Sequence, residues 1–567
     1  MNGTKKIVLI LFLFVAIDGL KAQLGFDPFH YSTNKKVTVS KGAVVSAHPL
    51  ASKVGVEILK KGGNAVDAAI ATQLALAVVY PAAGNLGGGG FLVGRLSNGK
   101  NLSLDYREKA PSKATRDMYL DSNGNPQMKL SQDGHLASGV PGTVAGLFAA
   151  HRYAKLPFSK LISPAIELAE KGFAITAREA HSLNDLQKRL FENNTVQSVF
   201  VKASGWKEGD TLIQPELAET LKRIRDKGAA GFYEGETARL IVEEMKRGHG
   251  IITEQDLRDY KVEERTATTF GYKGYTLVTM PLPSSGGIII EQCLKMMEKR
   301  KLESFGFQTP AAVQLMVEAE RRAFADRAEY MGDADFVKVP VKTLVSDKYL
   351  DDRMKDYVPG KAGSSDILKA GKIAHESEET THLAVVDEKG NAVAVTTTLN
   401  NSYGSATVVG GAGFFMNDEM DDFSVKPGVP NMYGALGTEA NAIAPGKRML
   451  SSMTPTLVLK NGKPFLVVGT PGGTTIPTSV FQTIVNVIDF KLSTEDAVNK
   501  PKFHHQWLPE NIMVEKDFPE ATRQALEKMG YKFTIRGPIG RSELIRIEGK
   551  KIEAVGDKRG DDTATGY

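Results

Sequence analysis

In this chain of 567 residues, the sequence around Thr380 suggests that this threonine could act as a nucleophile. It follows the acidic stretch Glu376–Glu379 and opens the strand-like segment Thr380–Val386. A threonine hydroxyl reacts usefully only when a base removes its proton, and the α-amine of an amino-terminal threonine can be that base. Because an α-amine has a pKa of about 7.7–8.0, a useful fraction is neutral near pH 7. In the middle of a chain, this chemistry requires cleavage of the peptide bond before Thr380.

The segments on either side of Thr380 suit such a cleavage. Residues 342–379 are polar and contain Pro359-Gly360 and Gly363-Ser364-Ser365, which predicts an exposed, mobile linker where the chain could be cut. Thr380–Val386, a turn-like segment and Ala392–Thr398 then predict a β-hairpin. On pattern alone, β-propensity is the simpler explanation for two threonines at a strand start.

The rest of the pattern predicts helices and strands in both halves of the chain. A strand is expected over 36–46, and a helical pattern interrupted at Gly62-Gly63 is expected over 50–79. A late strand is expected over 544–547, and further helices are expected over 162–169, 177–191, 215–227, 236–246 and 310–330. Mixed elements in both halves favour one assembly of helices and sheets over separate domains.

A glycine-rich run, Gly84-Asn85-Leu86-Gly87-Gly88-Gly89-Gly90, follows the helical pattern after Pro81. The backbone N–H groups of such a run could cradle an anion. The simpler interpretation, which we favour, is a tight buried turn where only glycine fits. The run lacks a Gly-Lys-Ser/Thr ending, so it does not match a phosphate-binding P-loop.

Three other residues could carry chemistry, but their neighbours favour structural roles. Cys293 is the only cysteine, which excludes an internal disulfide, and its apolar neighbours predict a core position. His504 and His505 have the chemistry of metal ligands, but adjacent histidines rarely bind one ion together. No cysteine or acidic partner lies at ligand spacing from them, so no metal site is predicted.

The charge balance does not indicate a nucleic-acid partner, and the amino terminus predicts export. Lysine and arginine number 71 and aspartate and glutamate 66, a net charge of +5 with no dense basic run beyond the first residues. Lys5-Lys6 precede the apolar run Ile7–Ile17, and Gly19–Ala22 could supply a cleavage site, so residues 1–22 are predicted to be a signal peptide. An uncleaved anchor is the alternative. No later stretch reaches the ~18 apolar residues of a transmembrane helix.

Several long motifs occur together in this chain. They are Ala82–Gly90, Leu104–Pro111, Met331–Ala334, Thr380-Thr381-His382, Asn417–Phe423, Leu450–Met453, Pro471-Gly472-Gly473 and Phe503–Pro509. Together they resemble the γ-glutamyltransferases, also called γ-glutamyl transpeptidases or glutathione hydrolases, of the N-terminal nucleophile hydrolase superfamily. The resemblance extends from about Val37 to Tyr567. The single cysteine and the signal-like leader resemble those of exported bacterial members, so a periplasmic or secreted location is expected.

The resemblance implies an α+β fold, a four-layer αββα sandwich built by one precursor that cleaves itself. A large subunit, residues 23–379, and a small catalytic subunit, residues 380–567, would form a heterodimer whose strands share the central sheets. Neither a metal nor an organic cofactor is implied. No nucleic-acid partner and no stable membrane span are expected.

The resemblance also implies the catalytic roles. Thr380 would be the nucleophile in both self-cleavage and turnover, and Thr398 would hydrogen-bond the Thr380 hydroxyl and help to activate it. Gly472 and Gly473 would donate backbone N–H groups to the oxyanion. Loss of one such donor typically lowers the rate by ~10²–10³.

For the substrate, the resemblance implies recognition of an α-amino-acid head group. Six residues match the family's binding positions: Arg107, Ser451 and Ser452 for the carboxylate, and Asn400, Glu419 and Asp422 for the ammonium group. Tyr433 would lie at the tip of a lid loop that excludes water and so favours transfer to an amine over hydrolysis. The implied donors are glutathione and other γ-glutamyl compounds, and the implied acceptors are water, amino acids and dipeptides.

Three departures from the family's pattern affect acceptor preference and rate. Thr474-Thr475 stands where Ser-Arg is expected, Thr397 where an aromatic is common, and Ala435–Glu439 where Val-Gly-Gly-Asp is frequent. None of them removes a named catalytic group. Two alternatives stay open: an acylase on the same scaffold that acts on glutaryl or other side chains, and an exported binding protein whose chain never splits.

Overall fold

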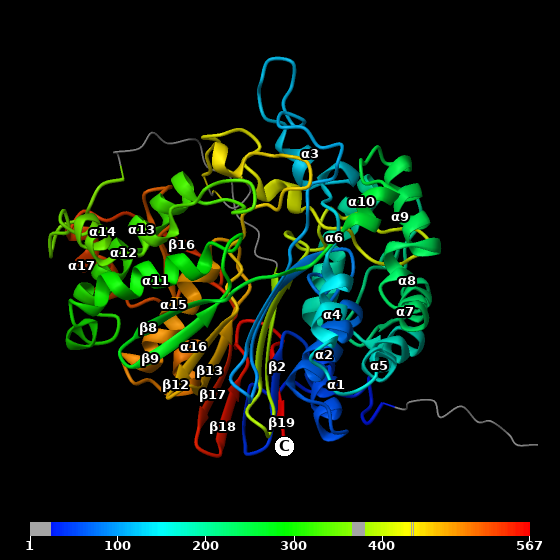
Figure 1. Cartoon of the computed structure of the whole chain (residues 1–567), viewed down its shortest axis with the longest axis horizontal. Helices are drawn as coiled ribbons and strands as arrows, with labels where there is room; N and C mark the ends of the chain where they lie inside the picture. Colours follow the sequence, from blue (N-terminus) through cyan, green and yellow to red (C-terminus); the bar gives the residue numbers. More distant parts are fainter. Residues whose placement is uncertain (1–23, 366–379, 432–433, 435) are drawn as a thin grey trace, which may run out of the picture.

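The computed structural model describes residues 24–365, 380–431, 434 and 436–567. Its core has four layers, with two seven-stranded sheets face to face and helices against each outer face (Figure 1). This arrangement confirms the predicted αββα sandwich. The predicted signal peptide, residues 1–22, lies outside the described residues. Within the described ranges, no helix is both long and apolar enough to cross a bilayer.

The sheet that contains Thr380 is covered by helices from the first part of the chain. Its outer face packs against α1 (Pro49–Lys60), α2 (Ala65–Val79) and α4 (Thr143–His151). Its strand order is β19 (Thr563–Gly566), β2 (Ala43–Ser46), β10 (Thr380–Val386), β11 (Ala392–Thr398), β3 (Gly89–Arg95), β4 (Asn101–Tyr106) and β7 (Glu263–Glu264).

The second sheet is covered on the opposite side of the molecule. Its outer face packs against α11 (Gly286–Glu298), α15 (Thr475–Ile488) and α16 (Thr494–Asn499), and α12 (Pro310–Tyr330) packs on α11. Its strand order is β1 (Lys36–Val39), β18 (Lys551–Val555), β17 (Glu543–Glu548), β13 (Lys463–Gly469), β12 (Thr456–Lys460), β9 (Tyr275–Thr279) and β8 (Thr268–Tyr272).

Both sheets combine strands from the two sides of residue 380. In the first sheet, β10 pairs with the earlier strand β2, and β11 pairs with the earlier strand β3. In the second sheet, β12 pairs with the earlier strand β9. The expectation that the two segments share the central sheets is confirmed, and main-chain hydrogen bonds hold them together wherever such strands meet.

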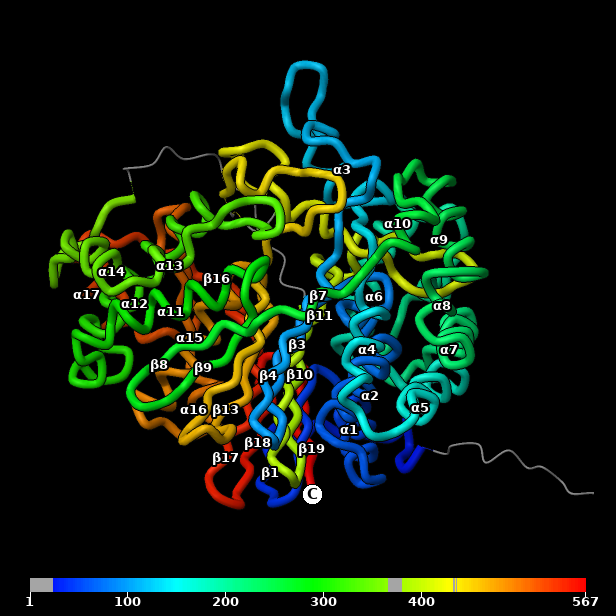
Figure 2. Tube along the Cα trace, in the orientation of Figure 1, coloured from blue at the N-terminus to red at the C-terminus, as the bar shows by residue number. Residues whose placement is uncertain are grey.

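Further helices lie on the same side as α5 (Phe158–Lys171), which packs on α2 (Figure 2). They include the three that the sequence predicts over 177–191, 215–227 and 236–246. The helices in this group are α6 (Ala177–Asn193), α7 (Pro215–Lys227), α8 (Ala230–Tyr233), α9 (Gly235–Arg247) and α10 (Glu254–Asp259).

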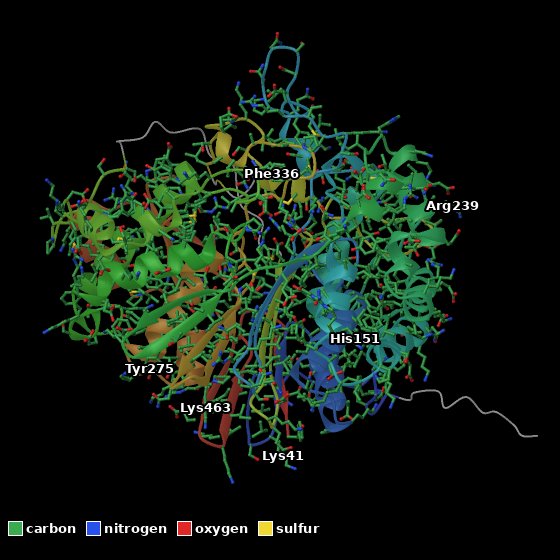
Figure 3. All side chains as sticks on the ribbon, viewed as in Figure 1. Lys41, His151, Arg239, Tyr275, Phe336 and Lys463 are labelled. Carbon is green, nitrogen blue, oxygen red and sulfur yellow. The ribbon has the colours of Figure 1, made fainter. Side chains whose placement is uncertain are left out.

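The predicted hairpin is present and forms the centre of its sheet. Every residue of β10 and β11 is buried, because a sheet faces one side of the hairpin and helices face the other. The register places Thr380 directly opposite Thr398. The turn between the strands lines a cavity together with Lys41 and Lys463, and both lysines lie at the lower end of the sheets (Figure 3). Thr380 and Thr398 therefore lie at the opposite end of the hairpin.

Two predictions about local structure are wrong in part. The strand expected over 36–46 is two strands, β1 and β2, which belong to different sheets. The linker expected over 342–379 begins with two short helices, α13 (Val341–Leu344) and α14 (Asp347–Arg353), because Leu344 and Leu350 are buried against the rest of the protein. Residues 366–379 lie outside the described part of the chain.

The glycine-rich run forms the tight buried turn that we favoured from the sequence. A Cβ atom on Gly84 would lie 2.1 Å from the Leu76 carbonyl oxygen, and one on Gly88 would lie 2.1 Å from the Thr398 carbonyl oxygen. Both distances are far below van der Waals contact, so backbone segments approach here more closely than any side chain allows. The run holds the end of β11 in place.

Cys293, His504 and His505 have the structural roles that we expected. Cys293 is buried in α11 within the second core, and burial raises the pKa of its thiol. His504 is fully buried, with Nδ1 2.8 Å from Thr478 Oγ1 and Nε2 2.9 Å from Gln506 Oε1. Burial lowers the pKa of both histidines to about 3, so they are neutral core groups near pH 7.

Candidate active site

The hydroxyl groups of Thr380 and Thr398 lie next to each other at the end of the hairpin. Thr380 Oγ1 donates to Thr398 Oγ1 over 3.4 Å, and the Asn400 backbone N–H donates to the same oxygen over 2.8 Å. Thr398 Oγ1 is thereby held by its own loop and oriented toward Thr380. Thr380 is 4% exposed and lines a cavity, so its hydroxyl is within reach of a small molecule but shielded from bulk water.

Buried side chains hold the loop that follows β11. Asn85, in the glycine-rich run, donates from Nδ2 to the Thr398 carbonyl oxygen over 2.9 Å and to Thr397 Oγ1 over 3.1 Å. Thr397 Oγ1 donates to the Gly89 carbonyl oxygen over 2.7 Å. Asn400 has a φ of 78°, a left-handed conformation that asparagine tolerates better than most residues, and its Nδ2 donates to the Asp418 carbonyl oxygen. Thr397 therefore links the glycine-rich run to β11 through its hydroxyl group, at a position where the family's pattern led us to expect an aromatic residue.

One cavity brings together most of the residues that the sequence places in the site. Its walls come from both segments of the chain and from both sheets. Gly472 does not line the cavity itself but precedes Gly473, which does. Tyr433 lies outside the described residues. The predicted residues that line the cavity are Thr380, Thr398, Arg107, Asn400, Glu419, Asp422, Ser451, Ser452 and Gly473.

Arg107 is the central charge of this cavity. It follows β4 directly and is 1% exposed. Its Nη1 lies 2.6 Å from Glu419 Oε2, and its Nη2 forms a close ion pair with Asp422 Oδ2. Burial alone would lower the pKa of Arg107, but Glu419 and Asp422 together raise it above its ordinary value. Glu108 Oε2 also lies 3.7 Å from Nη1, so Arg107 is a permanent cation that is already paired with three carboxylates.

Glu419 has an unusual environment for a carboxylate. It is fully buried, and its Oε1 atom has no hydrogen-bond partner among the residues that the structure describes. Burial raises the pKa of Glu419 well above its ordinary range, although Arg107 opposes this shift. A buried polar atom without a partner is rare in native structures, and either a water molecule or a ligand can satisfy it. Because Glu419 lines the cavity, a cationic group in the cavity could supply that partner.

The motif around Glu419 is anchored by Asn417. Asn417 Nδ2 donates to the Gly87 carbonyl oxygen over 2.7 Å, and Asn417 Oδ1 accepts the Glu419 N–H over 3.1 Å. The turn η3 (Glu419–Asp422) then places Glu419 and Asp422 on the Arg107 side. The motif at 417–423 therefore joins the glycine-rich run to the charged part of the cavity.

Ser451 and Ser452 line the cavity, and their segment is held mainly by hydrogen bonds to its backbone. The Ser451 N–H donates to the Pro283 carbonyl oxygen over 2.8 Å, and Ser285 donates from both its N–H and its Oγ to the Ser451 carbonyl oxygen, each over 2.8 Å. Ser452 Oγ accepts from Nη2 of Arg327 over 3.3 Å. Both serine hydroxyls thus stand on a fixed segment and can hydrogen-bond a carboxylate in the cavity.

Gly472 and Gly473 form a turn immediately before α15. Their φ values are 133° and 54°, which L-residues with side chains rarely adopt. The Gly472 carbonyl oxygen accepts from Thr475 N–H over 3.0 Å and from Thr475 Oγ1 over 2.7 Å, which fixes the turn. The N–H groups at the start of a helix favour negative charge, so this turn can stabilise an oxyanion. Thr475 supports the turn where an arginine was expected.

Five residues line the cavity although the sequence analysis did not name them as site residues. Arg327 is the most significant, because it brings a second guanidinium group into the cavity. Its sequence context gave little signal, since an arginine within a helix usually lies on a solvated face. The five are Arg327, Asn431, Met453, Thr474 and Ile476.

A larger cavity of about 310 Å³ lies elsewhere, beside Tyr80, Tyr403 and Arg541. It contains neither Thr380 nor any other predicted site residue. In the described part of the chain, no three histidine, cysteine or acidic side chains gather as a metal site would require. Chemistry rather than size therefore identifies the Thr380 cavity as the candidate active site.

The fold and this site together define the class of protein. A threonine begins a buried central strand of an αββα sandwich, beside a second hydroxyl and a glycine turn that can bind an oxyanion. This is the architecture of an N-terminal nucleophile hydrolase. The family model described as Gamma-glutamyltranspeptidase matches residues 51–567. The chain belongs to the γ-glutamyltranspeptidase family.

Individual relatives agree with this assignment. The chain is 46% identical over 551 residues to the glutathione hydrolase proenzyme of Escherichia coli strain K12, covering 95% of this chain and 93% of the relative. The crystal structure of Helicobacter pylori γ-glutamyltranspeptidase matches with 47% identity and a TM-score of 0.56, covering 57% of this chain and 94% of that one. Cephalosporin acylase from Bacillus halodurans matches with 27% identity and a TM-score of 0.83, covering 96% of this chain and 99% of that one.

Proposed function

We propose that this enzyme cleaves its own chain before Thr380 and then uses Thr380 to transfer the γ-glutamyl group of glutathione and related amides. Family membership supports this activity, because the similar E. coli protein is a glutathione hydrolase proenzyme. The geometry supports it independently. The observation that carries the proposal is the buried ion pair of Arg107 with Glu419 in the same cavity as the Thr380 hydroxyl.

In the self-cleavage step, Thr380 Oγ1 attacks the carbonyl carbon of Glu379. The hydroxyl proton passes to the departing nitrogen as the peptide C–N bond breaks, which gives an ester on the Thr380 oxygen and an α-amine on the same residue. Water then hydrolyses the ester, which leaves a carboxylate on Glu379 and restores the hydroxyl. The products are the proposed subunits, residues 23–379 and 380–567.

In turnover, the α-amine of Thr380 takes the hydroxyl proton as Oγ1 attacks the γ-carbonyl carbon of the substrate. The amide C–N bond then breaks, and the proton goes to the departing amine. Water resolves the γ-glutamyl ester to glutamate, or the amine of an amino acid or dipeptide resolves it to a new γ-glutamyl amide. Thr398 accepts a hydrogen bond from the Thr380 hydroxyl and so directs the oxygen lone pairs toward the carbonyl.

Charge develops on the former carbonyl oxygen during each attack. The N–H groups of Gly472 and Gly473 stand at the amino-terminal end of α15, where the helix dipole also favours negative charge. A donor of this kind increases the rate by a factor of ~10²–10³, because it is already oriented when the charge appears. Thr475 keeps the turn in place through its two hydrogen bonds to Gly472.

The head group of the donor is a zwitterion whose ammonium and carboxylate groups are attached to the same carbon atom. A site for it needs a cation and an anion side by side, which is what Arg107 and its carboxylate partners supply. The ammonium group would take the unpartnered Glu419 Oε1, and the carboxylate would take Arg107 with Ser451 and Ser452. The cavity that these groups line is narrow in this structure, and we propose that its lining side chains move as the substrate binds.

Three finer parts of the proposal concern the surroundings of the reaction. The acceptors are water, amino acids and dipeptides, and Tyr433 belongs to a lid that favours the amines. The processed subunits stay together as a heterodimer, which the shared sheets support. Export to the periplasm or the medium follows from the predicted leader at residues 1–22.

The test is denaturing gel electrophoresis of the purified protein, with amino-terminal sequencing of each band and an assay on a γ-glutamyl anilide. Two bands, the smaller beginning at Thr380, and release of the aniline are expected. Thr380→Ala is the matched control and should stay uncleaved and inactive. A wild-type chain that stays whole after long incubation would overturn the proposal and favour a binding protein.

An acylase is the second candidate, because cephalosporin acylase shares the fold. The two functions differ at the α-amino group, which a glutaryl substrate lacks. With such a substrate, Glu419 Oε1 would stay buried without a hydrogen-bond partner among the residues that the structure describes, which is costly. Faster turnover of a glutaryl anilide than of the γ-glutamyl anilide would establish the acylase function instead.

A further inference from the structure

Arg327 is a buried cation that forms no ion pair with a carboxylate in the part of the chain that the structure describes. It lies near the end of α12, is 7% exposed and lines the cavity that contains Thr380. No carboxylate oxygen lies within 4.0 Å of its guanidinium group among the residues described, whereas Arg107 is paired with both Glu419 and Asp422. Charged groups with this degree of burial are normally paired. Arg327 can therefore attract an anion that enters the cavity.

The contacts of Arg327 connect it to the serine pair. Its Nη2 donates to Ser452 Oγ over 3.3 Å, and its Nε donates to Ser285 Oγ over 3.1 Å. Ser285 in turn donates to the Ser451 carbonyl oxygen. Arg327 therefore holds Ser452 directly and Ser451 through one intermediate residue.

These contacts also fix the direction of the Ser452 hydroxyl. A guanidinium group can only donate, so Ser452 Oγ must act as the acceptor toward Arg327. The Ser452 proton is then available to an acceptor in the cavity, and a carboxylate oxygen is the strongest acceptor of this kind. Two of the five guanidinium N–H groups are used in these contacts, which leaves others to attract an anion.

We propose that Arg327 is a specificity-determining residue that selects donors with an α-carboxylate, by orienting Ser452 and by supplying the positive charge that Arg107 has already shared with Glu419 and Asp422. The inference rests on the proposed γ-glutamyl transfer and deepens it. Removal of Arg327 makes the cavity more negative by one charge. The altered cavity would still accept an ammonium group but would bind a carboxylate poorly.

Three anilides separate the two halves of the head group. The γ-glutamyl anilide carries both charges, the glutaryl anilide carries only the carboxylate, and the 4-aminobutyryl anilide carries only the amine. For Arg327→Met, kcat/KM should fall about 10- to 100-fold for the two substrates with a carboxylate, mainly through KM. For the 4-aminobutyryl anilide, kcat/KM should stay within about twofold of the wild-type value or rise. For the two substrates with a carboxylate, kcat/KM of Arg327→Lys should lie between the wild-type and Arg327→Met values, because lysine keeps the charge but loses the planar fork.

A structural control comes from the same helix. Arg322 is also buried, but it binds Glu318 and Asp356 rather than facing the cavity. Arg322→Met should lower stability and affect all three anilides equally. An equal loss of kcat/KM on all three anilides with Arg327→Met would show that Arg327 is merely structural. If the methionine variant does not fold, an equal loss on all three anilides with Arg327→Lys would lead to the same conclusion. A wild-type enzyme inactive on the γ-glutamyl anilide would instead overturn the proposed function itself.

Discussion

Thr380 and Thr398 are directly opposite each other in the antiparallel register of β10 and β11, and their hydroxyl oxygens lie 3.4 Å apart. The hairpin thus positions the proposed nucleophile and its hydrogen-bond acceptor through backbone pairing alone. A strand pair buried on both faces is rigid, so this arrangement varies little. In the proposed mechanism, the same hydroxyl pair would serve both self-cleavage and turnover.

Thr398→Ala tests this coupling. The substitution removes the acceptor for the Thr380 hydroxyl, so we expect kcat to fall about 10- to 100-fold and self-cleavage to slow by a similar factor. Thr398→Ser keeps the oxygen and should retain most of both rates. Gel densitometry follows the cleavage, and aniline release by processed protein gives kcat. Loss of turnover with normal cleavage would show that Thr398 serves only one of the two steps.

The sequence alone predicted the hairpin but not the full cavity. The alternation of strand-like runs around Asp387–Asn391 is local information, and its length sets the register that joins Thr380 to Thr398. Arg107, Glu419 and Ser451 lie far apart in the chain, and only the resemblance to a family grouped them. Arg327 was missed because nothing local separates a buried helical arginine from a solvated one.

The errors in secondary structure have similar causes. The run over 36–46 alternates like one strand, but Ser40-Lys41-Gly42 turns the chain from one sheet to the other. The short helices α13 and α14 carry few apolar residues, so their composition resembled that of a linker. Their burial depends on partners in α11, which a local pattern does not reveal.

Arg107→Lys tests recognition of the head group. Lysine keeps the positive charge but cannot contact Glu419, Asp422 and a carboxylate at once, because it lacks the planar fork. We expect KM for the γ-glutamyl anilide to rise about 10- to 100-fold, with kcat changed much less. Steady-state kinetics over a wide substrate range measure both. A fall in kcat with unchanged KM would place Arg107 outside ground-state binding.

Gly472→Ala tests the oxyanion turn. A Cβ atom on Gly472 would lie 2.4 Å from Thr475 Oγ1, so this hydroxyl must give up its hydrogen bond to the Gly472 carbonyl oxygen, and the φ of 133° is strained for alanine. Both effects should displace the N–H groups of the turn from the oxyanion. We expect kcat to fall by ~10²–10³ with little change in KM. Gly462→Ala is the matched control, since Gly462 also has a positive φ, 76°, but has open space around its Cβ position. Equal losses in both variants would point to backbone strain rather than to the oxyanion.

The buried histidines predict how stability depends on pH. Burial lowers the pKa of His382, His504 and His505 to about 3, whereas an unfolded histidine titrates near ~6.5. Between these values the unfolded chain binds protons that the folded protein does not, so the free energy of unfolding decreases as the pH falls below about 6.5. Each such histidine contributes ~1.4 kcal/mol per pH unit in this window. Buried carboxyls with a raised pKa, such as Glu320, oppose the trend and reduce the total.

His504→Asn isolates one of these contributions. Asparagine can keep a hydrogen bond to Thr478 but does not titrate, so the variant should lose stability less steeply than the wild type as the medium is acidified. The urea midpoint of unfolding, measured in steps from pH 7.5 to 5, gives both slopes. The slope is the informative quantity, because a repacking defect lowers the midpoint equally at every pH, whereas removal of a titrating group changes only its pH dependence. Parallel curves for the two proteins would show that His504 has the same pKa in the folded and unfolded chains, contrary to its burial between Thr478 and Gln506.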